Sequence, residues 1–167
     1  MIFLETDRLV LRNLMCNDAE IMYDYRNHES CSRYQRGQTK DFEGIKSLIQ
    51  AHQMDQITTS ANFVVAVALK CSNEMIGEIV VMPNDGAITL GYTFSYRYHR
   101  MGYAYEALNP FIAYLHQCYP EWEFICFTDV NNTASMALLK KLGYQDLGYA
   151  SKIDSQVFGK WITTEIL

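Results

Sequence analysis

Two segments could contact a ligand, because each follows a strand-like run and opens a helix-like run. Residues 98–107 read Tyr-His-Arg-Met-Gly-Tyr-Ala-Tyr-Glu-Ala and open the helix expected over Gly102–Gln117. The first N–H groups of a helix have no internal partner, and the helix dipole adds partial positive charge there. Gly102 has no side chain to keep a ligand away. This turn is predicted to hold an anion, most often a phosphate.

The second segment, residues 129–135, reads Asp-Val-Asn-Asn-Thr-Ala-Ser and follows the strand-like run Glu123–Val130. Both segments should lie at the carboxyl ends of neighbouring parallel strands, where α/β sheets place their ligands. Asn132 has a purely structural alternative as the N-cap of the next helix. Ser135 falls in the first turn of that helix, within reach of a ligand between the two strands.

The first third of the chain should supply one strand and two helices. The strand is expected over Leu4–Leu14. Asn17 and Glu20 have the spacing of a capping box, which predicts a helix from Asp18 to about Asn27. A second helix over Asp41–Gln53 has apolar residues at helical period. The intervening residues 28–40 are polar and irregular.

The rest of the chain predicts a mixed sheet. Residues 83–86, Pro-Asn-Asp-Gly, form a strong turn signal between strands. Pro110 should kink or break its helix, and Gly143 should cap the last one. The expected later elements are strands Phe63–Leu69, Met75–Met82, Ala87–Tyr96, Glu123–Val130, Tyr144–Ala150 and Val157–Ile166, with a helix over Thr133–Leu142. The fold class is therefore α/β (α+β), a mostly antiparallel twisted sheet flanked by helices, with a right-handed parallel βαβ unit over residues 87–130.

Composition favours an ordinary soluble protein with one domain spanning residues 1–167. Hydrophobic residues make up 49%, and neither a membrane span nor a signal peptide is recognisable. The five cysteines show no metal-binding spacing, which fits reduced thiols in the cytoplasm. A net charge of −5 argues against nucleic acid as a partner.

Several motifs spread over almost the whole chain carry a family resemblance. They are residues 5–12 (ETDRLVLR), 76–79 (IGEI), 90–92 (LGY), 102–107 (GYAYEA), 131–135 (NNTAS) and 141–144 (KLGY). In this order they resemble the GNAT N-acetyltransferase superfamily, in the style of the branch that includes ribosomal-protein-alanine N-acetyltransferases. A GxGxxG fingerprint is absent, so a Rossmann fold has little support.

The resemblance implies that acetyl-coenzyme A is the cosubstrate and that no metal is used. It places the pyrophosphate on the backbone of Arg100, Met101, Gly102, Tyr103 and Ala104. The pantetheine arm would run between Phe94, Ser95 and Tyr96 on one strand and residues 123–130 on a second strand that splays away from it. Asn132 and Ser135 complete the predicted cofactor site. The family motif begins with Gln or Arg where this chain has His99, which either contacts phosphate or is a loop residue facing solvent.

The resemblance also implies direct attack by an amine in a ternary complex, without a covalent enzyme intermediate. Backbone N–H groups of residues 94–96 would polarise the thioester carbonyl. Many family members protonate the leaving thiol with a tyrosine four residues after the Ser135 position, where this chain has Leu139. Ser135 is therefore the predicted general acid, with cofactor binding alone as its alternative. Glu78 is the predicted base if it faces the acceptor cleft, and a solvent-facing residue otherwise.

The acceptor is expected to be a small-molecule amine or a protein N-terminus. Its walls should come from His28, Arg33, Tyr34 and Arg36, while Glu106 is expected to be structural. The competing function is an acyl-coenzyme A sensor or a catalytically decayed GNAT domain, which the missing tyrosine favours. Neither a nucleic acid nor a membrane is an expected partner, and a homodimer is left open.

Overall fold

One mixed sheet organises the protein, which the computed structural model describes over residues 1–163. Within these residues the sheet has eight strands in the order β1-β2-β3-β4-β5-β6-β8-β7. The strands are β1 (Ile2–Glu5), β2 (Leu9–Arg12), β3 (Phe63–Leu69), β4 (Met75–Asn84), β5 (Ala87–Phe94), β6 (Glu123–Thr128), β7 (Gln145–Ala150) and β8 (Ser155–Lys160). Neighbours are antiparallel except β5 and β6, which confirms the predicted fold class.

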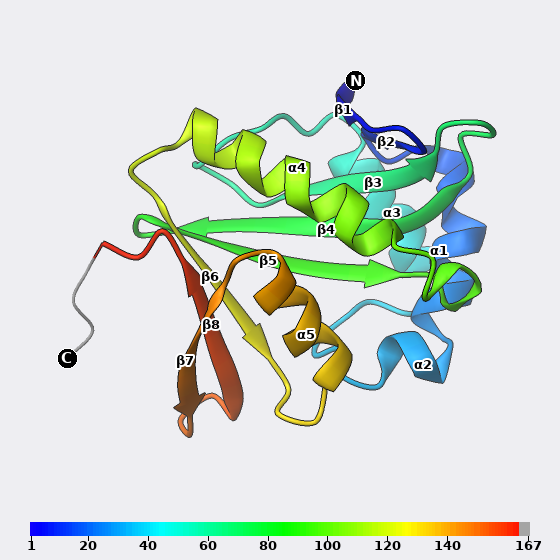
Figure 1. Ribbon diagram of the computed structural model, residues 1–167. Coiled ribbons are helices and arrows are strands. Elements are labelled where there is room, and N and C mark those ends of the chain that lie inside the picture. The colour runs from blue at the N-terminus through cyan, green and yellow to red at the C-terminus, as the bar shows by residue number, and fades with distance from the viewer. Residues whose placement is uncertain (164–167) are drawn as a thin grey trace.

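Helices cover both faces of this sheet (Figure 1). They are α1 (Ala19–Arg26), α2 (Glu29–Ser32), α3 (Phe42–His52), α4 (Tyr103–Cys118) and α5 (Thr133–Lys141), with 3-10 turns η1 (Cys16–Asp18) and η2 (Tyr96–Tyr98). Strand β3 shows why both faces need cover. Val65 and Val67 pack beneath α4, while Val64 and Ala66 pack against α1 and α3. A strand buried on both sides reads as a continuous apolar run, as the sequence of β3 does.

The N-terminal strand expected over Leu4–Leu14 is instead a hairpin, in which β1 pairs with β2 in antiparallel register. The predicted capping box at Asn17 and Glu20 is also wrong. Asp18 is the residue before α1, and its carboxylate accepts hydrogen bonds from the Met15 backbone N–H (2.7 Å) and from Arg12 (2.9 and 3.0 Å). The carboxylate closes the loop before α1 and neutralises a buried guanidinium.

Helix α4 continues through Pro110, so of the predicted kink or break the break does not occur. Proline lacks one N–H, and the helix tolerates that loss because its buried face holds Ala107, Leu108, Phe111 and Leu115 against the sheet. Gly143 follows α5 with φ +91°, the left-handed value expected of a helix-ending glycine.

Strands β5 and β6 pair over only three residues of each strand and then separate. The paired residues are Ala87–Thr89 and Glu123–Ile125. In Figure 1 the two strands start together and point apart. The predicted splayed pair is therefore present, and it leaves the backbone edges of residues 91–94 and 126–128 facing a gap.

The C-terminal strand is expected from the sequence over Val157–Ile166. The observed strand is β8, and residues 164–166 lie outside the described part of the chain. Among the helices of residues 1–163, none combines the length and apolar character needed to cross a bilayer.

Candidate active site

A cavity of about 540 Å³ occupies the gap between β5 and β6. On one face of the sheet it is lined by residues of α4 and α5, among them Ala104, Ser135 and Leu139. On the other face it is lined by residues of α2 and the loop that follows it, including Cys31 and Tyr34. A volume of this size suits a small-molecule ligand. Because the cavity has walls on both faces of the sheet, parts of two molecules can meet within it, one on each side.

The turn before α4 has the geometry of an anion site. Gly102 precedes the helix with φ +80°, and Arg100 also has a left-handed φ of +63°. The first helical backbone bond runs from the Glu106 N–H to the Gly102 carbonyl (3.1 Å). The N–H groups of Tyr103, Ala104 and Tyr105 therefore have no partner within the helix and point out from its end. Ala104 also lines the cavity, which joins the turn to the gap between the strands.

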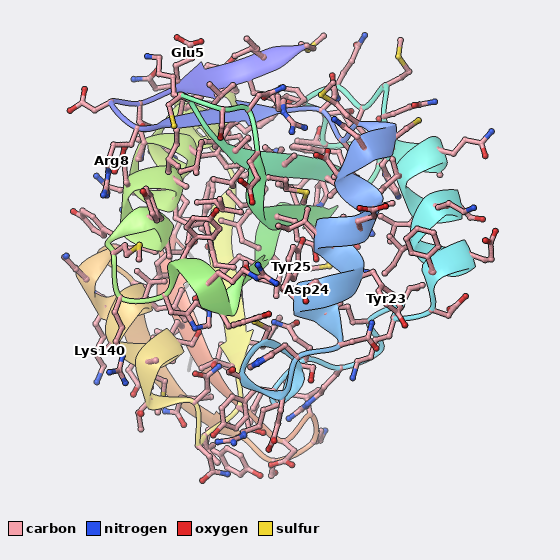
Figure 2. All side chains as sticks on the ribbon, turned by 90° about the vertical axis from the view of Figure 1, so that its right-hand side faces the viewer. Glu5, Arg8, Tyr23, Asp24, Tyr25 and Lys140 are labelled. Carbon is pink, nitrogen blue, oxygen red and sulfur yellow. The ribbon has the colours of Figure 1, made fainter. Side chains whose placement is uncertain are left out.

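Arg8, from the β1–β2 connection, and Glu106, from the first turns of α4, hold this turn in place. Glu106 accepts hydrogen bonds from the Arg8 Nε (2.7 Å) and from the Thr6 hydroxyl (2.6 Å). Arg8 also donates to the Met101 carbonyl (3.1 Å) and stacks on the Tyr103 ring. Figure 2 shows Arg8 beside α4. Glu106 thus has the structural contacts expected of it, and Arg8 is an anchor of the turn that the sequence did not single out.

The three residues at the end of β5 that were predicted to bind the cofactor make different contacts. Phe94 lines the cavity, and its carbonyl oxygen lies 2.8 Å from the His99 Nε2. Ser95 is fully buried, and its N–H donates to the Ile76 carbonyl (2.8 Å), so that N–H is already occupied. Tyr96 stacks on His28 and donates its phenol hydrogen to Asp24. His99 therefore contacts the strand end rather than facing only solvent.

Helix α5 brings Asn132 and Ser135 to the cavity wall. The Asn132 side chain caps the helix by accepting a hydrogen bond from the Ser135 N–H (3.2 Å). The Ser135 hydroxyl lies 2.9 Å from the Tyr92 hydroxyl on β5. Leu139 is buried one turn further along α5 and lines the same cavity. A phenol is thus present beside Ser135, although it comes from a strand and not from α5.

The loop between α2 and α3 lines the cavity on the opposite face of the sheet. Tyr34 and Arg36 line the cavity as expected, whereas His28 stacks on Tyr96 and the exposed Arg33 pairs with Glu29. Arg36 reaches across the gap and donates to the Ile153 (2.9 Å) and Asp154 (2.7 Å) carbonyls in the β7–β8 turn. The loop therefore spans the two halves of the splayed sheet.

Glu78 lies outside the cavity lining and is 1% exposed. Both of its oxygens accept hydrogen bonds from Arg26 on α1, at 2.9 and 2.8 Å. Burial raises the pKa of the Glu78 carboxyl, and Arg26 opposes that rise. The Gln38 amide connects Glu78 (3.4 Å) to the Thr93 hydroxyl (3.1 Å), and Thr93 does line the cavity. Glu78 is thus neither solvent-facing nor in the cleft.

Cys126 is a buried thiol on the cavity wall, and it is poorly suited to be a nucleophile. Burial raises the pKa of the Cys126 thiol to about 11. At pH 8 roughly 0.1% of the Cys126 side chain would be thiolate, the reactive form.

We expect iodoacetamide to modify the exposed Cys16, Cys71 and Cys118 in the folded protein and to leave Cys126 unmodified, as peptide mass spectrometry would show. Alkylation of Cys126 at the rate of the exposed cysteines would contradict this placement.

The splayed strand pair, the helix N-terminus at its edge and the cavity with walls on both faces define a mixed α/β fold whose ligand site lies between two diverging strands. The chain belongs to the GNAT acetyltransferase family, because the family model described as acetyltransferase (GNAT) domain matches residues 8–145. It is an acetyltransferase, as the sequence motifs indicated.

Relatives and solved structures agree with this assignment. A curated Bacillus subtilis protein, the uncharacterized N-acetyltransferase YoaA, is 28% identical over 87% of this chain and 84% of its own. A GNAT-family acetyltransferase from Bacillus anthracis is similar in structure with a TM-score of 0.80 at 20% identity, covering 95% of this chain and 96% of that one. RimL, a ribosomal L7/L12 alpha-N-protein acetyltransferase in complex with coenzyme A, also gives 0.80 at 12% identity, covering 96% and 97%.

Proposed function

We propose that this enzyme transfers the acetyl group of acetyl-coenzyme A to a primary amine by direct attack in a ternary complex. The observation that carries the proposal is the cavity, which is lined by α4 and α5 on one face and by α2 and its following loop on the other. Such a cavity lets a donor and an acceptor approach each other from opposite faces. Holding both reactants together lowers the entropic cost of the reaction.

The donor belongs on the α4 and α5 face. The unpaired N–H groups at the start of α4, together with the backbone of Arg100 to Gly102, suit the pyrophosphate. The pantetheine arm is an extended chain with amide groups, so it suits the open strand edge between Phe94 and β6 as an added strand would. The side chains of Asn132 and Ser135 lie at the same wall. The solved RimL structure, which holds coenzyme A and shares this fold, supports the choice of ligand.

The chemistry supports Ser135 more directly than Glu78. When the amine nitrogen bonds to the carbonyl carbon and the C–S bond breaks, the electron pair goes to sulfur. A hydroxyl donor at the sulfur stabilises that charge, and Ser135 is a hydroxyl on the cavity wall. Glu78 instead has both oxygens bonded to Arg26. We therefore assign Glu78 to positioning the acceptor wall through Gln38 and Thr93.

The competing function, an acyl-coenzyme A sensor, is favoured by one observation. Leu139 stands where many family members have the tyrosine that protonates the thiol. Both functions need the cofactor site, so both predict that coenzyme A stabilises the protein. At a hundredfold excess over Kd the stabilisation should be about 2.7 kcal/mol. Only the transferase predicts release of free thiol.

A panel of amines separates the two functions. We expect acetyl-coenzyme A to release free thiol with at least one amine class, measured with a thiol reagent against a reaction without amine. The panel should hold peptides with free Ser or Ala N-termini, polyamines, amino acids and aminoglycosides. The peptides are included because solved structures of similar fold are described as ribosomal-protein acetyltransferases. Stabilisation by coenzyme A with no thiol release from any amine would favour the sensor.

A further inference from the structure

The hydroxyl groups of Tyr92 and Ser135 form a pair inside the cavity. They lie 2.9 Å apart, and both residues line the gap between β5 and β6. Tyr92 comes from the strand and Ser135 from the first turn of α5, so the pair bridges the two elements beside the donor face. Strand alternation places Tyr92 on the same face as Leu90 and Phe94, which pack beneath α4 and α5.

Either hydroxyl of this pair could donate the hydrogen bond that joins them, and the burial of the Tyr92 phenol favours Tyr92 as the donor. Each hydroxyl has one hydrogen to donate and lone pairs that accept. Within residues 1–163, the hydrogen-bond partner of the Tyr92 phenol is Ser135. Burial raises the pKa of this phenol above its usual value near 10, so the phenol keeps its hydrogen at neutral pH. A protonated phenol that is largely withdrawn from water needs an acceptor, and the Ser135 oxygen is the one beside it.

If Tyr92 donates to Ser135, the hydrogen of Ser135 is left to point elsewhere. The Ser135 backbone N–H is already bonded to Asn132, which fixes the start of the helix and so the position of the hydroxyl. Ser135 lines the cavity, and within residues 1–163 its hydroxyl has no hydrogen-bond partner besides Tyr92. By donating to the Ser135 oxygen, Tyr92 restricts the rotation of the Ser135 hydroxyl and leaves its hydrogen directed at a ligand in the cavity.

We propose that Tyr92 is a positioning residue that aims the Ser135 hydroxyl at the sulfur of coenzyme A. The inference rests on the proposed function in one respect, namely that coenzyme A is the ligand. In the reaction the amine nitrogen bonds to the carbonyl carbon, the C–S bond breaks, sulfur takes its electron pair, and Ser135 donates a hydrogen bond to the resulting thiolate. The proton that sulfur finally gains equals the one that the amine loses, and Tyr92 stays protonated throughout. A phenol from β5 thereby supports the step for which Leu139 supplies no group.

The test measures the acidity of bound coenzyme A, because that property does not require turnover. The thiolate absorbs in the ultraviolet, so its titration can be followed in the complex, with desulfo-coenzyme A as the blank. If the hydroxyl pair stabilises the thiolate, Tyr92→Phe should lower the ratio of thiolate to thiol about tenfold at a given pH, which raises the bound thiol's pKa by about one unit. Ser135→Ala should have at least the same effect.

Two comparisons distinguish positioning from a general structural role. The double variant should match Ser135→Ala alone, because Tyr92 acts through Ser135. Tyr119→Phe is the matched control. It makes the same change at the end of α4 remote from Gly102, and it should leave the bound thiol unchanged. With an amine that the panel shows to be active, Tyr92→Phe should lower kcat about 10- to 100-fold with little change in the KM for acetyl-coenzyme A.

The outcomes separate this inference from the proposed function. A bound thiol with wild-type acidity in Tyr92→Phe would overturn the inference, as would effects of the two single variants that simply add. A weaker Kd for coenzyme A without any change in thiol acidity would also overturn it, because that result describes a structural contact. No thiol release from any amine, together with a Tyr92-dependent thiol acidity, would overturn the transferase and uphold the inference.

Discussion

Gly102→Glu is expected to raise the Kd for coenzyme A at least about 100-fold, which corresponds to about 2.8 kcal/mol. The new carboxylate would lie at the N-terminal end of α4, where the unpaired N–H groups point. It would repel the pyrophosphate and compete for the same partial positive charge. A Cβ at this position would also lie 3.6 Å from the Arg8 Nη2, so the glutamate could engage the guanidinium that anchors the turn. Isothermal titration with coenzyme A measures the loss.

The matched control for this variant is Gly86→Glu. Gly86 has φ +79°, nearly the same left-handed value as the +80° of Gly102, and a Cβ added at Gly86 would meet no atom within 4 Å. Both variants should lose about 1–2 kcal/mol of folding stability, because side chains disfavour this conformation. Gly86 lies in the β4–β5 turn, away from the cavity lining, so its affinity for coenzyme A should stay within about twofold of wild type. Equal affinities in the two variants would contradict the phosphate turn at Gly102.

The elements that the sequence predicted well are those with strong local signals. The run Phe63–Leu69 is apolar at every position because both faces of β3 are covered. The N-terminal hairpin was missed for the opposite reason. Its turn contains neither glycine nor proline, and it is held by Glu106, which is 98 residues from Arg8 along the chain. The one-turn helix α2 is too short to show any periodicity.

The same difference between local and long-range signals explains which residues of the site the sequence predicted. The turn at Gly102 combines a glycine with the start of a helix, so its signal is local. Tyr92 carried no such signal, because its partner Ser135 is 43 residues away. One clue was present: Tyr92 alternates with the apolar Leu90 and Phe94, so its phenol shares their face of β5, which α4 and α5 cover. For Glu78, a carboxylate within an apolar run required a buried cation, but the sequence did not identify Arg26, 52 residues earlier.

Arg26→Met is expected to lower the free energy of unfolding by about 3–5 kcal/mol, because it leaves Glu78 buried without its cation. The side chains of the pair are 4% and 1% exposed, so water cannot replace the lost partner. Arg26 also donates to the Thr39 carbonyl (2.9 Å), which anchors the end of the loop that walls the cavity. Urea denaturation measures the loss. Arg33→Met is the control, since the exposed Arg33–Glu29 pair should contribute less than about 0.5 kcal/mol.

The pH dependence and a second substitution test whether the charge of Glu78 is the cause. Burial already raises the pKa of Glu78 above its usual 4.5, and the loss of Arg26 must raise it further. A carboxyl with a raised folded-state pKa binds its proton more tightly in the folded protein. The stability that protonation of Glu78 contributes is therefore fully present below the pKa that Glu78 has in the unfolded protein. It is lost as pH rises through the pKa that Glu78 has in the folded protein. The loss in the free energy of unfolding that Arg26→Met causes should become smaller as pH falls from about 8 towards 4.5.

Glu78→Gln should therefore have opposite effects in two backgrounds. In the wild-type protein it leaves Arg26 as an uncompensated buried charge and should destabilise the fold. In the Arg26→Met protein it removes the unpaired carboxylate, so it should recover stability and abolish the pH dependence. A destabilising effect in both backgrounds would mean that the shape of Glu78, and not its charge, matters at this position. A change in the sign of the Glu78→Gln effect between the two backgrounds would show that Arg26 and Glu78 depend on each other. Each would then stabilise the fold only when the other is present.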